Sequence, residues 1–377
     1  MHINDGDLIL TGQELCAALK GLGLTISNLA ALPEVSFTSD QSSEAAKYLD
    51  ELSVSQRSLF TSAFNVLAKP AKTVRLHYSI ADESVSRYVL GWGSALSEGV
   101  AVLVKSGDTY RVGVRTEPDL TYMMGQVLAI NDNLHSDNFG VSSSTEAILV
   151  FMAVTDTLRY ARHYSCLIHT EPVTSFTPSE VKDRLEDAGT EDFRWPLLFV
   201  DKILPIPVAQ MGLIVNLEPS LQELEEKGLI TSLDDVGGQQ LYALTKEGEI
   251  IADALLHEVS KATIGISALR EDSTLGHEVM LLVRSSLSLF LFDISGKEGV
   301  VAMLSGSDLA ELVKSMLGRN VTSSEQEKPE SPTPELAQPA EQAPTTQTPA
   351  TSAAYCPKCG QKVNPVDNFC INCGIKL

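Results

Sequence analysis

The sequence predicts an α+β protein. Two related lobes, each an antiparallel sheet with helices on one face, precede a disordered tether and a small cysteine-rich module. Alternating apolar and polar residues, typical of half-buried strands, fill residues 73–115 and again residues 263–304. Segments with helical spacing flank both series. The composition then changes at residue 320, and four of the six cysteines lie in the last 22 residues.

The first lobe, residues 1–135, opens with a helix that Thr11 would cap and that Gly21 and Gly23 would end. The short intervals between its strand patterns favour antiparallel pairing. In chain order we expect helices at 14–20, 45–52 and 57–67, strands at 73–80, 86–91, 99–105 and 109–115, and a helix at 118–128.

A connecting helix is expected within residues 136–175. Its pattern starts at Ser144, and apolar residues such as Ile148, Phe151 and Leu158 follow at helical spacing. Because the pattern is long and largely apolar, we expect this helix to pack between the two lobes.

The second lobe, residues 176–319, opens with a capping box formed by Thr177 and Glu180, with Pro178 at the first helical position. It repeats the order of the first lobe, which predicts an internal duplication. The alternative is the general self-similarity of any α+β chain cut in two. We expect helices near 181–185 and at 221–227, 247–259 and 307–317, and strands at 263–269, 277–284, 287–293 and 298–304.

One segment of the second lobe, residues 219–258, resembles the end of a winged-helix regulator. There a helix ends in Lys227-Gly228-Leu229-Ile230, a hairpin follows, and Leu244-Thr245 leads into the last helix. Between residues 219 and 265, however, nine residues are acidic and three are basic. A DNA-reading surface needs Lys and Arg facing phosphates. We therefore expect a winged-helix shape that serves packing or protein contact, and DNA binding is the alternative.

The overall charge argues against nucleic-acid binding. The chain has 49 Asp and Glu against 28 Lys and Arg, a formal net charge of -21. Residues 320–354 contribute -4 and residues 355–377 contribute +2, which leaves -19 on the body, residues 1–319. Binding to nucleic acid or to an anionic membrane requires a basic surface. At 44% hydrophobic residues, the body has ample material for a large core.

The chain shows no sign of membrane insertion or export. The apolar run at 148–154 is far shorter than the ~18 residues that a membrane span requires. The first seven residues are acidic and lack the basic and apolar regions of a signal peptide. We expect a cytoplasmic protein.

Common enzyme signatures are missing. The sequence contains no phosphate-binding loop, no Gly-x-Ser-x-Gly elbow, no His-Glu-x-x-His and no dinucleotide-binding fingerprint. His163, Cys166 and His169 lie near one another, but this spacing is more typical of a helix end than of a metal site. We expect neither catalytic nor organic-cofactor-binding residues, and hence no enzyme.

The tether, residues 320–354, holds six prolines, five glutamates and no aromatic residue. Such a segment cannot bury enough apolar surface to fold, so we expect it to be a disordered linker. Residues 355–377 that follow carry two Cys-x-x-Cys pairs separated by ten residues. Four thiolates at this spacing suit one tetrahedral, structural Zn²⁺, with a redox dithiol pair or an iron site as alternatives. The expected ligands are Cys356, Cys359, Cys370 and Cys373.

The module at 355–377 closely resembles the zinc ribbons found at the ends of many prokaryotic proteins. The layout of the body also resembles the EspG family of type VII secretion chaperones. The matching features are Leu10–Leu15 followed by Leu32-Pro33, the segment Leu67–Pro70 feeding the strand at 73–80, and the glycine-punctuated strands up to Arg115. This resemblance implies two α+β lobes about a pseudo-twofold axis, and helical secretion substrates as partners.

Two hypotheses follow for function, with a third in reserve. The first is a non-enzymatic cytoplasmic adaptor or chaperone that holds a protein partner and uses the zinc ribbon as a docking module. The resemblance implies type VII secretion substrates as that partner. The second is a winged-helix transcription regulator. The third is an enzyme with an unrecognised site.

Overall fold

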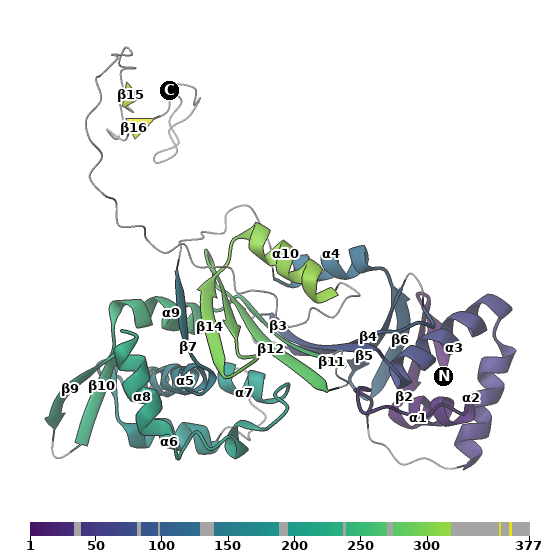
Figure 1. Cartoon of the computed structure of the whole chain (residues 1–377), viewed down its shortest axis with the longest axis horizontal. Helices are drawn as coiled ribbons and strands as arrows, with labels where there is room; N and C mark the ends of the chain where they lie inside the picture. Colours follow the sequence, from purple (N-terminus) through teal and green to yellow (C-terminus); the bar gives the residue numbers. More distant parts are fainter. Residues whose placement is uncertain are drawn as a thin grey trace. The chain divides into compact units, whose positions relative to one another are not determined.

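The computed structural model describes residues 1–33, 39–80, 84–96, 99–128, 139–187, 195–236, 239–269, 274–317, 354–355 and 362–363. The chain divides into two compact units, Met1–Ser324 and Glu325–Leu377. Every helix in the described part of the chain belongs to the first unit (Figure 1).

The first half of this unit contains six strands and four helices among the described residues. Its strands are β1 (His2–Asn4), β2 (Asp7–Thr11), β3 (Lys72–Ile80), β4 (Ser84–Trp92), β5 (Val100–Ser106) and β6 (Thr109–Arg115). Its helices are α1 (Gly12–Gly21), α2 (Ser39–Glu51), α3 (Val54–Ala68) and α4 (Glu117–Val127).

The second half repeats this order with a larger helical group. Its strands are β7 (Gly140–Ser144), β8 (Ser175–Phe176), β9 (Ile230–Val236), β10 (Gln239–Leu244), β11 (Ser260–Leu269), β12 (Leu275–Arg284), β13 (Leu289–Asp293) and β14 (Glu298–Met303). Its helices are α5 (Thr145–Leu167), α6 (Pro178–Glu186), α7 (Pro196–Asp201), the 3₁₀ turn η2 (Val208–Gln210), α8 (Leu217–Glu226), α9 (Lys246–Leu256) and α10 (Gly306–Leu317).

The fold class is confirmed as mixed helix and antiparallel sheet, but both halves share one sheet. Its eleven strands follow the order β1-β2-β6-β5-β4-β3-β11-β12-β13-β14-β7. We had expected a separate sheet in each lobe. The sheets merge because β3 and β11, the first long strand of each half, pair along their full length, which satisfies two edges that would otherwise be unpaired.

The strand order is symmetric about this central pair. Outward from β3, the neighbouring strands in the sheet are β4, β5, β6 and β2. Outward from β11, they are β12, β13, β14 and β7. Leu76 pairs with Ile264 at the middle of the β3–β11 ladder. The arrangement supports the internal duplication that the sequence suggested.

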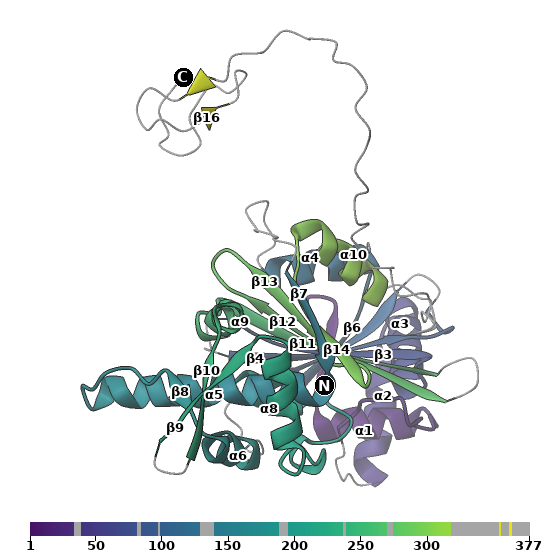
Figure 2. The same ribbon diagram turned by 60° about the vertical axis from the view of Figure 1, so that its left-hand side comes forward.

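Helices cover both faces of the sheet. On one face, α4 and α10 pack over a core that includes Val74, Leu76 and Leu90 from the first half and Ile264 and Leu282 from the second. On the other face, α1–α3 cover the outer strands of the first half and α5–α9 those of the second. Figure 2 shows α4 and α10 together on one side, with the two larger helical groups on the other.

The long helix α5 differs from its expected position between two lobes. Its buried apolar residues, 147–154 and 158, join the core formed with α6–α9 and strands β12–β14. The strand before it, β7, pairs with β14 just as β2, the strand before α1, pairs with β6. By this topology α5 corresponds to α1. The residue that corresponds to Thr11, the N-cap of α1, is therefore Ser144, the N-cap of α5, and not Thr177.

The expected capping box at Thr177 is confirmed, and the same device recurs elsewhere. Thr177 Oγ1 accepts from the backbone N–H of Glu180, and a Glu180 oxygen accepts from the N–H of Thr177. Equivalent boxes start α1 at Thr11 and α4 at Thr116.

The domain boundaries expected at 135 and 319 remain predictions, because residues 129–138 and 318–353 lie outside the described residues. The tether is part of that range.

No helix in the described part of the chain is long and apolar enough to span a membrane. In the second unit, strands β15 (Ala354–Tyr355) and β16 (Lys362–Val363) pair antiparallel, with Tyr355 opposite Lys362.

Candidate functional site

The four expected zinc ligands, Cys356, Cys359, Cys370 and Cys373, lie outside the described residues. The donor set itself fits the metal, because two Cys-x-x-Cys pairs supply the four thiolates that tetrahedral Zn²⁺ prefers. The segment that joins β15 to β16 contains the first pair. Such a site has no open position, and its chemistry would be structural: holding together a module too small for a core of its own.

The other two cysteines have ordinary structural roles. Cys16 is buried on α1, and its thiol donates to the carbonyl of Pro33 at 3.4 Å. Cys166 is exposed near the end of α5. No group of three or more His, Cys, Asp or Glu suited to a metal ion occurs among the described residues, so His163, Cys166 and His169 do not form one.

A row of basic side chains crosses the sheet on the face opposite α4 and α10. Lys105 of β5 lies opposite Arg87 of β4, Arg87 lies opposite His77 of β3, and His77 lies opposite Thr263 of β11. Residues directly opposite on antiparallel strands share a face and lie about 5 Å apart at Cβ. We call Lys105, Arg87 and His77 the central basic row.

This row combines two basic side chains, Lys105 and Arg87, with one neutral histidine. Burial, and then the charges of Arg87 and Arg75, lower the pKa of His77 to about 4, so that it is neutral at pH 7. Arg75, two residues away on the same face of β3, donates to the carbonyl of Ile203 at 2.7 Å. No Asp or Glu occupies this face on the described residues of β3, β4, β11 and β12.

Buried polar atoms beside the row lack partners. Thr263 is fully buried, and neither its hydroxyl nor Nδ1 of His77 has a hydrogen-bond partner among the described residues. On the neighbouring strand pair, Ser267 Oγ lies 2.9 Å from Nδ1 of His277. Burial, and then the charge of Arg75, lower the pKa of His277. The sequence analysis missed this row. Its sign in the sequence was that alternation places Arg75 and His77 on one face of the strand at 73–80, and Arg87 on one face of the strand at 86–91.

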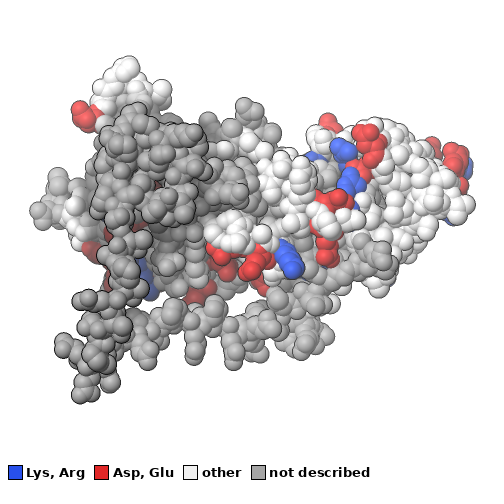
Figure 3. Space-filling view, turned by 90° about the horizontal axis from the view of Figure 1, so that it is seen from above, with Lys and Arg blue, Asp and Glu red and all other residues white. Residues whose placement is uncertain are grey.

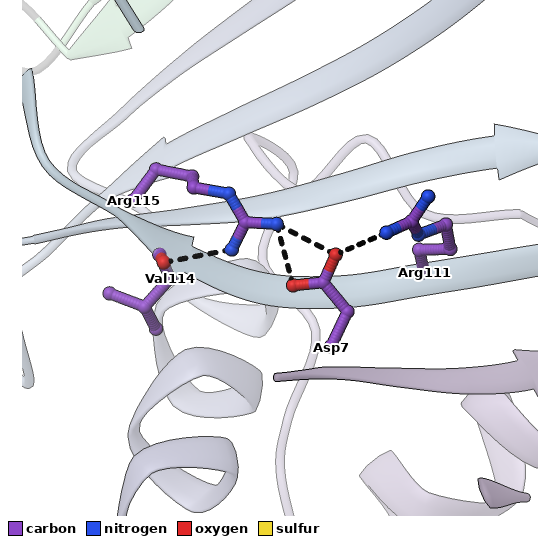
Figure 4. A network of polar contacts seen from close by, with 4 residues as sticks. All are labelled: Asp7, Arg111, Val114 and Arg115. Atoms are coloured by element: carbon purple, nitrogen blue, oxygen red, sulfur yellow. Dashed lines mark hydrogen bonds and ion pairs between the residues drawn. The ribbon is translucent and has the colours of Figure 1, made fainter. Parts of the chain in front are cut away.

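A second polar network clamps the edge of the first half (Figure 4). Asp7 of β2 is buried and accepts from Arg111 Nη2 at 3.0 Å and from Arg115 Nη2 at 2.7 Å through each carboxylate oxygen. Arg115 Nη1 also donates to the carbonyl of Val114 at 3.0 Å. A Cβ at Gly113 would lie only 2.1 Å from Asp7 Oδ1, so glycine makes room for the carboxylate.

This network borders a cavity of about 250 Å³ under α4, which Asp119 also lines. Within it the two arginines face the two carboxylates of Asp7 and Asp119, so the charges balance. We therefore assign the network to structure: it ties strand β2 to strand β6. It leaves little attraction for an external anion.

The winged-helix resemblance extends further than residues 219–258. Strands β8, β10 and β9 form a separate three-stranded sheet in that order, with α5 and α6 around β8 and α8 preceding the β9–β10 hairpin. Gly248 at the start of α9 is required, because a Cβ there would lie 2.0 Å from the carbonyl oxygen of Leu229. This close approach explains the Leu-Thr-x-x-Gly pattern at Leu244–Gly248.

Helix α8 occupies the position of the DNA-reading helix in a winged-helix domain, and it is acidic. Its glutamates make internal contacts: Glu223 accepts from Ser143 and Ser144 of β7, and Glu225 accepts from Ser232 of β9. Burial alone would raise the pKa of Glu223, but these hydrogen bonds from Ser143 and Ser144 outweigh it and leave the pKa lowered. Both carboxylates therefore stay ionised near pH 7. Figure 3 shows one face of the body, on which basic and acidic side chains lie close together.

Trp92 is buried at the end of β4, between Gly91 and Gly93. Lys72 Nζ lies 5.2 Å from the centre of its ring and donates to the carbonyl of Met316 at 2.5 Å. This lysine thereby satisfies a carbonyl at the C-terminal end of α10. Trp92 therefore belongs to the core and not to an exposed partner site.

Comparison with known proteins gives a family match for the C-terminal module and a structural likeness for the body. Residues 355–377 match the model of a zinc-ribbon domain. No curated protein matches the chain. The body is similar to the Mycobacterium tuberculosis type VII secretion system chaperone EspG5, solved in complex with a PE25-PPE41 dimer. The identity is 12%, the match covers 82% of this chain and 95% of that one, and the TM-score is 0.43.

Proposed function

We propose that this chain is a non-enzymatic, cytoplasmic adaptor or chaperone whose body holds an acidic surface of a protein partner. The central basic row carries this proposal. Lys105 and Arg87 lie directly opposite each other on one sheet face, and like charges in that position destabilise a sheet. An acidic surface of a partner would be electrostatically complementary to the row, which supports a binding role.

The layout of the sequence supports a particular partner class. The segments Leu10–Leu15 and Leu67–Pro70 and the duplicated order of strands resemble those of EspG-type chaperones. Helical substrates of type VII secretion are therefore the partners that we propose. The zinc ribbon, with one Zn²⁺ held by Cys356, Cys359, Cys370 and Cys373, is proposed to serve as a separate protein-docking module.

A charge-reversal experiment tests the binding role of the row. The tagged full chain and its Arg87→Glu/Lys105→Glu variant are used to recover partners from native cytosol, and the recovered proteins are quantified by mass spectrometry. We expect acidic protein partners with the unaltered chain and at least tenfold less of them with the variant. Lys20→Glu, on the exposed end of α1, is the matched control and should recover the same partners. Equal recovery with the double variant would reject the row as the binding surface.

A winged-helix transcription regulator is the second candidate, because the β8-β10-β9 sheet completes the expected local fold. The acidic character of α8 argues against it, because a DNA-reading helix needs cations facing phosphates and α8 carries four glutamates and no Lys or Arg. A gel-shift experiment at low salt with genomic DNA fragments decides between the two. Binding that weakens steeply as salt rises would favour the regulator.

A further inference from the structure

The last turns of α5 display an apolar and aromatic stripe to solvent. Tyr160, Tyr164, Leu167 and Ile168 are 52%, 55%, 78% and 49% exposed. Their spacing places them on one side of the helix. In Figure 2 this part of α5 extends beyond the helices around it. Scattered apolar residues are common on protein surfaces, but a contiguous stripe of this kind marks an interaction site.

A cavity of about 260 Å³ opens beside the stripe. Among described residues its lining consists of Arg159, Tyr160, His163, Tyr164, Leu167 and Trp195. Tyr, Trp and Arg are the residue types that dominate the binding energy of protein interfaces. The lining thus combines flat aromatic surfaces with cations, and none of these six residues is acidic.

Stacked cations fix the aromatic rings. The guanidinium carbon of Arg184 lies 4.7 Å from the ring centre of Tyr160 and 5.4 Å from that of Trp195. The guanidinium carbon of Arg159 lies 5.4 Å from the ring centre of Trp195. Trp195 therefore lies within reach of both arginines, and these contacts preorganise the lining before any partner arrives.

Two acidic side chains, Asp156 and Glu258, lie near Arg159. Asp156 is fully buried; its Oδ2 accepts from the backbone N–H of Leu197 at 3.4 Å, and its Oδ1 has no partner among the described residues. Burial raises the pKa of Asp156 to about 8, so it is largely uncharged at pH 7. The carboxylate of Glu258 contacts both Lys261 and, at 3.7 Å, Arg159.

From this combination we infer that the stripe and cavity at the end of α5 form a second docking site, which takes an acidic segment of a protein partner with aromatic or aliphatic anchor residues. Its apolar surface would cover the stripe, and its carboxylates would face Arg159, His163 and Arg184. A second copy of this chain fits less well, because two such sites face to face would bring like charges together. The site lies on a different element from the central basic row and is independent of the proposed function.

Peptide selection on the full chain tests this inference. A phage-displayed library of random 16-residue peptides is selected against the unaltered protein, and enriched sequences are synthesised with a fluorescent label. We expect Asp and Glu to be enriched around aromatic or aliphatic residues. We also expect binding to weaken at least tenfold in the Tyr164→Ala/Leu167→Ala variant. Both side chains are exposed, so the variant should keep the unfolding midpoint of the unaltered chain.

Two controls separate this site from other surfaces. Tyr122→Ala/Leu287→Ala removes an equally exposed tyrosine and leucine elsewhere, 71% and 57% exposed, and should leave binding unchanged. Arg87→Glu/Lys105→Glu should also retain it, which distinguishes a failure here from a failure of the proposed function. Enrichment of basic or uncharged peptides, or equal binding to the Tyr164→Ala/Leu167→Ala variant, would overturn the inference. So would a dimer of the unaltered chain in sedimentation that this variant dissociates, because the stripe would then bind a second copy.

Discussion

Leu76 of β3 lies directly opposite Ile264 of β11, at the midpoint of the nine residue pairs that join the two halves of the sheet. Both side chains are buried under α4 and α10, within a single core to which the two halves contribute. The pair thus occupies the pseudo-twofold axis of the body. Continuous pairing and a shared core predict that the halves unfold together.

Truncation at this axis should destabilise the whole body. Leu76→Ala and Ile264→Ala are each expected to lower the free energy of unfolding by about 2–5 kcal/mol, the range for removing a buried aliphatic side chain. Urea unfolding measures the change. The two tryptophans provide a probe in each half, Trp92 in the first and Trp195 in the second.

The coupling of the halves is checked with single-tryptophan variants. Trp195→Phe leaves a probe of the first half and Trp92→Phe one of the second. Coincident urea transitions, shifted equally by Leu76→Ala, are expected. Two separated transitions would show that the halves unfold independently.

Glycine 113 should be intolerant of even one added methyl group. Gly113→Ala would place Cβ 2.1 Å from Asp7 Oδ1, which is too close for both atoms. We expect the free energy of unfolding to fall by about 2–4 kcal/mol, because the buried carboxylate is displaced. Chemical denaturation measures it. Gly140→Ala is the matched strand control, because its Cβ would meet no atom closer than 3.9 Å.

The mechanism at position 113 is tested by a double-mutant cycle. In an Asp7→Ala background the added Cβ no longer meets a carboxylate, so Gly113→Ala should cost much less there. Additive losses would show that the alanine acts through strand conformation instead.

Asp156 should make the stability of the body fall as pH rises. Its folded pKa of about 8 lies above the unfolded value of ~4, so its contribution is fully present below about pH 4 and is lost progressively up to pH 8. Asp156→Asn mimics the protonated acid, and we expect it to stabilise the body by about 1–3 kcal/mol at pH 7. Urea unfolding from pH 5 to 8 should show a difference that grows with pH; a difference constant across this range would contradict the assignment.

The zinc ribbon should carry one Zn²⁺ per chain. Metal analysis of the purified full chain is expected to give a ratio near one, and Cys356→Ser/Cys359→Ser should abolish it because two of four thiolates are lost. Cys16→Ser/Cys166→Ser removes the two remaining cysteines and should keep the metal. Zinc that follows Cys16 and Cys166 instead would refute the proposed ligands.

The sequence predicted those parts of the fold that have a local signal. Strands β3–β6 and β11–β14 follow from alternation, and α5 follows from helical spacing. Strand β7 was missed because Gly-Val-Ser-Ser-Ser has little strand propensity, and it is held instead by β14 and by Glu223 of α8.

The candidate sites were harder to predict because they join distant parts of the chain. Asp7 contacts Arg111 and Arg115, more than a hundred residues away, and Trp195 packs with Arg159 and Arg184 from two different helices. Alternation did place Arg111, Gly113 and Arg115 on one face of β6, but nothing local identified Asp7 as their partner. The position of β3 beside β11 likewise depends on long-range pairing.

The seam between β3 and β11 also bears on how such a chain could arise. An isolated half would present its first long strand as an unpaired edge, and the partner that best matches that edge is the same strand of a second, antiparallel copy. The shared edge thus has the geometry of a homodimer interface, with both partners carried on one polypeptide. The two halves differ in what they attach to this sheet: the helical group from α5 to α9 belongs to the second half, where the proposed docking site lies.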